Sequence, residues 1–261
     1  MTILKHELRQ GRLSFLIWTI SIAFLLLICV FLFPEMKAQM AGVSSLFASM
    51  GSFTKAFGMD VLNFGELTGF YAIECGNIMG LGGAFFAAFC AVPMLSKEEK
   101  DHTADFLLTH PVSRRRIAGE KLGAVLLQIT LMNLLSFVIV ILSILMIGET
   151  LPLKELSLLH MSYYLLQLEL AGICFGISAF LHSSGFGIGL GIATIAYFLN
   201  LIANLSDRAA FLKYITPFGY ADGASIISSG SLDPAMLIPG MLLGAAGILI
   251  GFCKYCRKDI V

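Results

Sequence analysis

The sequence predicts an all-α, polytopic membrane protein with six transmembrane helices, and its composition and the length of its apolar runs carry this prediction. Of the 261 residues, 57% are hydrophobic and only 13% are charged, whereas a typical soluble domain has roughly 25% charged residues. A soluble globule of this size could not cover its surface with so few charges. The apolar runs are continuous and do not alternate, which favours helices over barrel strands. The composition therefore excludes an ordinary soluble enzyme.

Charged residues mark the limits of the predicted spans. A crossing helix needs about 20 apolar residues, and uncharged stretches of about this length or more recur along the chain. The longest stretch is divided by the polar segment His182-Ser183-Ser184-Gly185. We treat residues 1–261 as a single transmembrane domain with an interfacial helix at 1–12, spans at 13–33, 71–96, 122–148, 157–181, 186–205 and 234–253, and a polar loop at 97–121.

The basic residues are distributed unevenly over the loops between these spans. If both termini lie on one side of the membrane, that side receives 12 of the 17 Lys and Arg residues. Basic loops stay in the cytoplasm, so we expect a multi-pass protein of the cell membrane with both termini in the cytoplasm. The formal net charge is +0, and we expect contact with membrane lipid and no nucleic-acid partner.

The loop at 97–121 is the polar centre of the sequence. It holds 11 of the 34 charged residues, yet the apolar patch Phe106–Leu108 lies in its middle. We expect a short amphipathic helix over Glu98–Thr109, because Pro111 disfavours helix in the residue before it. A plain basic loop would explain the arginines but not the patch, whereas apolar residues within a polar rim indicate a docking surface. The candidate docking residues are Glu98, Glu99, Asp101, Thr103, Asp105, Phe106, Leu107, Leu108 and Pro111.

A second helix is expected to begin after this surface and to enter the third span. Ser113 is suited to cap its first turn, and the basic residues that follow would lie at the level of the lipid headgroups. These candidate interface anchors are Arg114, Arg115, Arg116 and Lys121.

The same loop resembles the cytoplasmic signature of type-2 ABC exporter permeases, which follows the second of six spans in that family. The family pattern is an acidic start, a Thr, a Leu-Leu pair, a Pro-Val-Ser-Arg element and a Gly-Lys that enters the third helix. This chain departs from it at His102, where Gly is common, and at Glu120, which separates the Gly from the Lys. The matching residues are Glu98-Glu99, Thr103, Asp105-Phe106-Leu107-Leu108-Thr109, Pro111-Val112-Ser113-Arg114 and Gly119-Glu120-Lys121.

Two softer resemblances lie outside this loop. Residues 215–222, Ile-Thr-Pro-Phe-Gly-Tyr-Ala-Asp, are similar to the stretch before the last helix of many of these permeases. The basic start Lys5–Arg12 is similar to the interfacial elbow helix of the family.

The resemblance implies a transport subunit of a bacterial inner membrane that is not itself an enzyme and binds no cofactor. The phosphate-binding motif G-x-x-x-x-G-K-[ST] is absent from the sequence, and ATP and Mg would be bound by a separate cytoplasmic ABC ATPase, present in two copies. The helix between the second and third spans would be a coupling helix seated on that ATPase. A second permease subunit is also implied, and we favour a homodimer over a heterodimer. Given 21 Phe and 12 Met residues, we expect export of an amphipathic or hydrophobic cargo, such as a toxin peptide, a bacteriocin or a drug.

Four polar residues in or near the spans are candidates for a substrate path or gate. A charge at the centre of a bilayer costs roughly 2.5–3.5 kcal/mol even on lenient scales. Glu74, near the outer end of the second span, and Glu169, midway along the fourth, therefore need partners, water or protonation. Asn200 and Asn204 lie four residues apart on the fifth span. The alternative for all four is a packing role between helices.

Glycine alternates with larger residues at the start of the fifth span. Gly185, Gly187, Gly189 and Gly191 form two overlapping pairs of small residues four apart. Such pairs let helix backbones approach closely, so we expect this part of the span to pack against another helix.

Two other classes stay open, an intramembrane enzyme and a non-transporting sensor or assembly protein. The metalloprotease motif H-E-x-x-H is absent from the sequence. Cys253 and Cys256 form a lone C-x-x-C with no second pair, and His102 and His110 lie eight residues apart in a loop. We therefore expect no metal site, and co-purification with an ATPase would discriminate between the classes.

Overall fold

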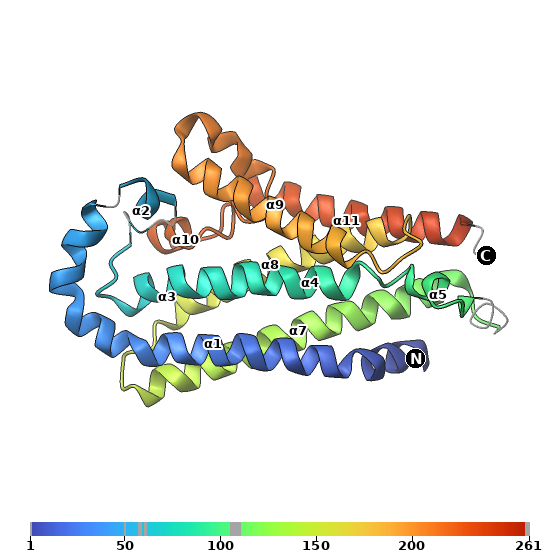
Figure 1. Cartoon of the computed structure of the whole chain (residues 1–261), viewed down its shortest axis with the longest axis horizontal. Helices are drawn as coiled ribbons and strands as arrows, with labels where there is room; N and C mark the ends of the chain where they lie inside the picture. The colour runs from blue at the N-terminus through green and yellow to red at the C-terminus, as the bar shows by residue number, and fades with distance from the viewer. Residues whose placement is uncertain (1, 50, 57–58, 60–61, 105–110, 259–261) are drawn as a thin grey trace.

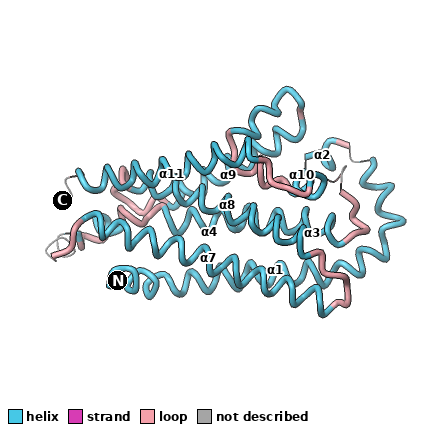
Figure 2. Tube along the Cα trace, turned by 180° about the vertical axis from the view of Figure 1, so that it is seen from behind, coloured by secondary structure: helices cyan, strands magenta, loops and turns pink. Residues whose placement is uncertain are grey.

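The computed structural model describes residues 2–49, 51–56, 59, 62–104 and 111–258. These residues form helices joined by turns and loops, and no strand is present among them (Figure 2). Six helices are long and apolar enough to cross a membrane, which confirms the predicted fold class and number of spans. The helices run along one long axis, and both termini lie at one end of it (Figure 1). We call this end the terminal end and the opposite end the distal end.

The first span is longer than predicted. Helix α1 extends over Thr2–Ser49, so residues 2–12 continue the span and a separate interfacial helix is not shown. Pro34 lies inside α1, and α1 bends beyond the bundle toward its C-terminal end (Figure 1). A proline removes one backbone hydrogen bond and clashes with the preceding turn, which accounts for a bend in this helix.

The second span changes its helix type along its length. The α-helix α3 (Leu67–Cys75), the π-helix η1 (Gly76–Gly82) and the α-helix α4 (Gly83–Ala91) follow one another directly. A π-helix displaces backbone groups from the α-helical hydrogen-bond pattern. Gln167 Nε2 on a neighbouring helix donates to the Met79 carbonyl at 3.2 Å, so a side chain from outside supports this irregular turn.

Polar caps and a glycine turn separate the remaining elements. The Ser113 hydroxyl accepts a hydrogen bond from Arg116 N at 3.4 Å, which confirms the expected N-cap. Gly185 lies at the predicted break between the fourth and fifth spans and has a left-handed backbone with φ of 60°. The remaining elements are α2 (Ser52–Ala56), α5 (Lys97–Lys100), α7 (Arg114–Met146), α8 (Leu153–Ser178), α9 (Phe186–Leu205), the 3₁₀-helix η2 (Asp207–Tyr214), α10 (Gly223–Ser229) and α11 (Pro234–Arg257).

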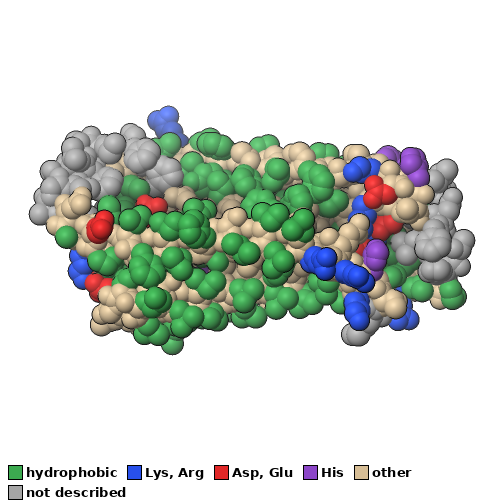
Figure 3. All heavy atoms as spheres, turned by 60° about the horizontal axis from the view of Figure 1, so that its bottom comes forward, with side chains coloured by type: hydrophobic (Ala, Val, Ile, Leu, Met, Phe, Trp, Pro, Cys, Tyr) green, Lys and Arg blue, Asp and Glu red, His purple; other side chains and the backbone are tan. Residues whose placement is uncertain are grey.

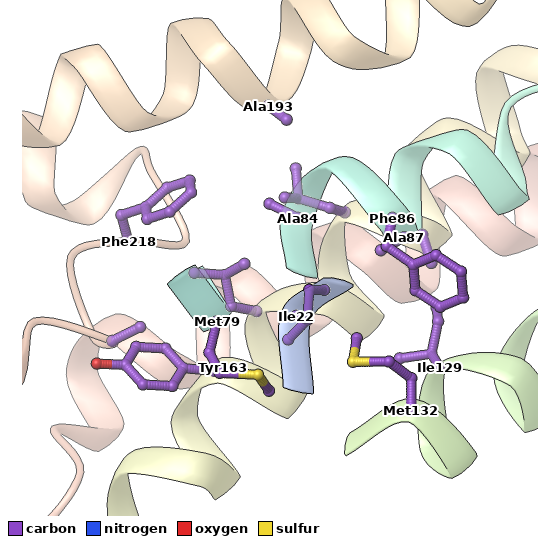
Figure 4. Close-up of a cluster of buried hydrophobic side chains, with 14 of the residues drawn as sticks. Ile22, Met79, Ala84, Phe86, Ala87, Ile129, Met132, Tyr163, Ala193 and Phe218 are labelled. Atoms are coloured by element: carbon purple, nitrogen blue, oxygen red, sulfur yellow. The ribbon is translucent and has the colours of Figure 1, made fainter. Parts of the chain in front are cut away.

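The core of the bundle is built around α8, which packs against α4, α7 and α11 and buries most of its residues. Figure 4 shows a part of this core, in which Phe86 of α4 lies close to Ile129 and Met132 of α7. Close packing of such side chains fixes the relative positions of the helices.

The outer surface of the bundle is apolar along its sides. Leu242 and Leu249 on α11, for example, are each 65% exposed. Figure 3 shows apolar side chains over the middle of the molecule and charged side chains toward its two ends. Outward-facing apolar residues of this kind match contact with lipid chains.

Helices α8 and α11 approach each other through glycines. A Cβ added at Gly172 or Gly176 would lie under 3.0 Å from the carbonyl oxygen of Gly244 or Gly247, respectively. Small residues four apart on a membrane helix permit such backbone contact. The α8–α11 pair therefore depends on the absence of side chains at its interface.

The alternating glycines of α9 differ in what surrounds them. A Cβ at Gly189 would meet Val92 Cβ at 3.2 Å, whereas at Gly187 or Gly191 it would meet no atom of the described chain within 4 Å. The expected close packing is present at Gly189, whereas no described residue of this chain provides it at Gly187 or Gly191.

Candidate functional site

A group of charged side chains is buried at the terminal end, where α5 meets α1 and α7. Lys121 of α7 is 0% exposed, and its Nζ lies 3.2 Å from Glu7 Oε1 and 2.5 Å from Glu98 Oε1. The same Nζ donates to the Met94 carbonyl at 2.7 Å. Lys97 pairs with the other side of the Glu7 carboxylate, which is itself only 3% exposed.

A second set of contacts joins α5 to the end of α11. Lys258 Nζ lies 2.7 Å from Glu99 Oε1 and donates to the Leu181 carbonyl at 3.1 Å. His182 Nδ1 lies 2.8 Å from Glu99 Oε2, and Arg114 of α7 donates to the Lys258 carbonyl. We call Glu7, Lys97, Glu98, Glu99, Lys121 and Lys258 the ionic network.

The ionic network attaches the short helix α5 to three long helices. Removal of one partner from a buried ion pair leaves an uncompensated charge in a poorly solvated place, which is strongly destabilising. The network therefore holds the start of the 97–121 loop in a single position relative to α1, α7 and α11.

The predicted docking residues divide into three groups in the structure. Glu98 and Glu99 belong to the ionic network, while Asp101, Thr103 and Pro111 are exposed. Helix α5 extends over Lys97–Lys100 and so includes the first three residues of the helix predicted over Glu98–Thr109. The other predicted docking residues lie outside the described residues: Asp105, Phe106, Leu107 and Leu108.

The predicted interface anchors also differ from one another. Arg115 and Arg116 are exposed, and Arg116 pairs with Glu120 one turn later at 3.0 Å. Arg114 is partly buried against the end of α11. Lys121 is buried inside the bundle between the carboxylates of Glu7 and Glu98, and its role as an interface anchor stays a prediction.

Of the two acids in or near the spans, Glu169 is the more deeply buried, at 2% exposed. The Tyr220 hydroxyl donates to Glu169 Oε2 at 2.9 Å. Burial and the nearby Glu169 charge raise the pKa of Tyr220, so its hydroxyl stays a donor. A Cβ at Gly240 of α11 would overlap this carboxylate, which fits the packing alternative for Glu169. Glu74 is half-buried on α3.

A cavity of about 490 Å³, its open mouth included, lies toward the distal end between α3, η1, α8, α9 and α10. Asn200 and Asn204 both line it, whereas neither acid of the spans is among its described lining residues. Asn204 Nδ2 donates to the Ala56 carbonyl at 3.2 Å. Asn200 is 8% exposed, and its Oδ1 has no hydrogen-bond partner among the described residues.

Four further polar residues line this cavity and were not predicted from the sequence. Tyr197 donates to Asn77 Oδ1 at 2.9 Å, and Tyr163 and Asp222 complete the set. A weak signal exists for Asn77, an amide inside an otherwise apolar run. Among the described residues, no group of three or more His, Cys, Asp or Glu side chains could hold a metal ion.

Comparison with known protein families agrees with this architecture. A family model described as "ABC-2 family transporter protein" matches residues 1–252. No curated protein matches the chain. The match covers nearly the whole chain and identifies a multi-pass membrane permease, a transport subunit without an ATPase domain. The chain therefore belongs to the ABC-2 family of transporter proteins.

Proposed function

We propose that this chain is the permease of an exporter that couples ATP hydrolysis in a separate ABC ATPase to efflux of an amphipathic or hydrophobic cargo. Two ATPase copies would dock at the terminal end, which faces the cytoplasm in this proposal because most Lys and Arg residues lie there. The observation that carries the proposal is the ionic network, which ties the start of the docking loop to three long helices.

The docking segment itself would be Asp105–Leu108, with Asp101 and Thr103 on its approach. The chain is anchored on both sides of this segment, by Glu98 and Glu99 before it and by Lys121 after it. A displacement imposed by the ATPase would therefore move the helices and would not be absorbed by a slack loop. In this arrangement residues 1–12 and the exposed Arg115 and Arg116 lie at the level of the cytoplasmic headgroups.

Two permease copies would enclose the cargo path, because six closely packed helices leave little room for a large cargo. We favour a homodimer. The expected cargo is a toxin peptide, a bacteriocin or a drug, in keeping with an interior rich in Phe and Met. Stimulation of ATP hydrolysis by candidate peptides, measured on the purified complex, would identify the cargo.

The docking step can be tested by co-expressing this chain with candidate ABC ATPases from the same organism and measuring co-purification. Leu107→Asp places a charge in the proposed apolar contact, so the variant should lose the ATPase and cargo-stimulated hydrolysis. Ser183→Asp is the matched control, because it adds the same charge at the same end on the exposed α8–α9 loop. The control should keep both properties.

Retention of the ATPase by Leu107→Asp would place the docking surface elsewhere. If the unmodified chain binds no ATPase at all, the proposal of a coupled exporter fails, and a non-transporting sensor or assembly role takes its place.

A further inference from the structure

We propose that the distal cavity binds the primary ammonium group of a cargo. The inference rests on the proposed function in one respect, namely that the bound molecule is cargo. The site itself rests on the geometry of the cavity, on the unpaired oxygen in its wall and on the sign of the charge that it holds.

The first observation is an unsatisfied acceptor in the cavity wall. Asn200 is more than nine-tenths buried, and its Oδ1 has no partner among the described residues. A buried acceptor without a partner is costly, and such groups in folded proteins call for an explanation. Since the χ2 torsion of Asn has a broad profile, the amide can turn toward a hydrogen-bond donor that enters the cavity.

The second observation is the charge of the lining. Asp222 is the only Asp or Glu among the described lining residues, and none of them is Lys, Arg or His. Asp222 Oδ2 caps α10 through Ser225 N at 3.2 Å. A carboxylate with no neighbouring cation in the lining attracts ammonium groups and repels carboxylates and phosphates.

The third observation is the aromatic and irregular wall. The rings of Tyr197 and Phe218 meet edge to face, with their centroids 5.4 Å apart, and aromatic faces stabilise cations. Gly76, at the start of the π-helix, also lines the cavity, and a Cβ there would come within 3.0 Å of the Tyr163 hydroxyl. Short π-helical segments often occur at functional sites, and the glycine here lets the Tyr163 hydroxyl approach the backbone at the cavity wall.

The proposal predicts selectivity for the headgroup at a constant apolar tail. Dodecylammonium, dodecanol and dodecanoate would be titrated by calorimetry into the full chain in phosphatidylcholine nanodiscs, whose lipids have no primary amine. Dodecylammonium should bind at least about tenfold more tightly than dodecanol, the size expected for hydrogen bonds to a charged group. Dodecanoate should bind more weakly than either. Equal affinities for the three compounds would overturn the proposal.

Asp222→Asn tests the charge with the least disturbance, because Asn caps a helix about as well as Asp. This variant should lose the preference for dodecylammonium over dodecanol. Asp233→Asn is the matched control, since Asp233 also caps a helix, α11, at the same end but does not line the cavity. The proposal fails if both variants change the preference equally.

Asn200→Leu tests the unpaired acceptor. It should weaken dodecylammonium binding about tenfold without lowering the unfolding temperature, because it removes an oxygen that has no partner among the described residues. Unchanged binding would contradict the proposal.

The source of the ammonium group is assigned by competition. An amphipathic helical peptide with one lysine, and the same peptide with that lysine acetylated, would be added against bound dodecylammonium. Displacement by the lysine peptide alone supports a peptide cargo, and displacement only by small amines supports a drug-like one. These binding measurements need neither ATP nor the ATPase, so failure of ATPase docking and failure of the cavity proposal are separate results.

Discussion

The two ends of the bundle both concentrate polar side chains, but they use them in opposite ways. At the terminal end, charged groups are buried against each other, with Lys121 between Glu7 and Glu98. Toward the distal end, amides and hydroxyls surround a cavity, and Asn200 keeps an acceptor unpaired. Paired charges hold one geometry, whereas an unpaired group beside a cavity keeps the capacity to bind.

This difference matches the two tasks of a transport subunit. One end must transmit a displacement without deforming, and the other must contact a molecule that comes and goes. The contrast predicts that polar substitutions at the terminal end cost stability and that those in the cavity cost binding. Four experiments test this contrast, beginning with the largest expected effect.

Lys121→Met should cause the largest decrease in the free energy of unfolding. It leaves the buried Glu7 and the partly buried Glu98 without their shared cation, and breaking a buried ion pair in this way costs about 3–5 kcal/mol. The free energy of unfolding would be measured by denaturant titration in detergent micelles.

Arg115→Met is the control for Lys121→Met, because Arg115 lies on the same helix, α7, but is exposed. The free energy of unfolding of this variant should differ from that of the unmodified chain by no more than about 0.5 kcal/mol. Equal losses in the two variants would show that the ionic network does not hold this end together.

Gly176→Ala should have the next largest effect, because α8 and α11 connect the two ends. The added methyl group would lie 2.5 Å from the Gly247 carbonyl oxygen, so the two helices must move apart. This overpacking should lower the free energy of unfolding by about 1–3 kcal/mol. Gly187→Ala is the control, since its Cβ meets no described atom within 4 Å. Denaturant titration of both variants checks the difference, and a comparable loss in the control would mean that helix contact is not the cause.

The number of spans could be predicted from the sequence because it depends on the length of apolar runs, which is a property of the chain alone. The break at 182–185 and the N-cap at Ser113 were predictable for the same reason, since each depends on local residue types. Six spans and this cap are present in the structure.

The partners of the polar groups were not predictable, because they depend on which helices meet. From the sequence, Lys121 was predicted to anchor the chain at the membrane interface. Its partner Glu7 lies on α1, so their contact depends on how α1 packs against α7. Gly172 and Gly176 differ from Gly187 and Gly191 only in what lies opposite them. Asn200 stood out as an amide in an apolar helix, but its cavity is completed by residues from other elements, among them α3, η1, α8 and α10.

The pair Glu99–Lys258 sharpens the comparison between the ends, because a second pair at the opposite end has the same 2.7 Å separation. Glu99 and Lys258 are nearly buried, whereas the side chains of Lys37 and Glu149 are 49% and 27% exposed. Double-mutant cycles with alanine should give a coupling energy of about 1 kcal/mol or more for the first pair. The exposed pair should give about 0.2–1 kcal/mol, and its coupling alone should fall in high salt.

Asn200→Leu should change the stability of the folded chain least, and any change should be an increase. Leucine is larger than asparagine, but position 200 lines the cavity, which leaves room for the added volume. The change removes an acceptor that has no partner among the described residues, so the variant should be unchanged or more stable by up to about 1 kcal/mol. Asn204→Leu is the matched change one turn later, and it loses the hydrogen bond to the Ala56 carbonyl, at about 0.5–1.5 kcal/mol. Thermal unfolding of both variants in nanodiscs decides the point. A large loss in Asn200→Leu would mean that the amide holds the distal helices together, so that both ends of the bundle would be built for rigidity.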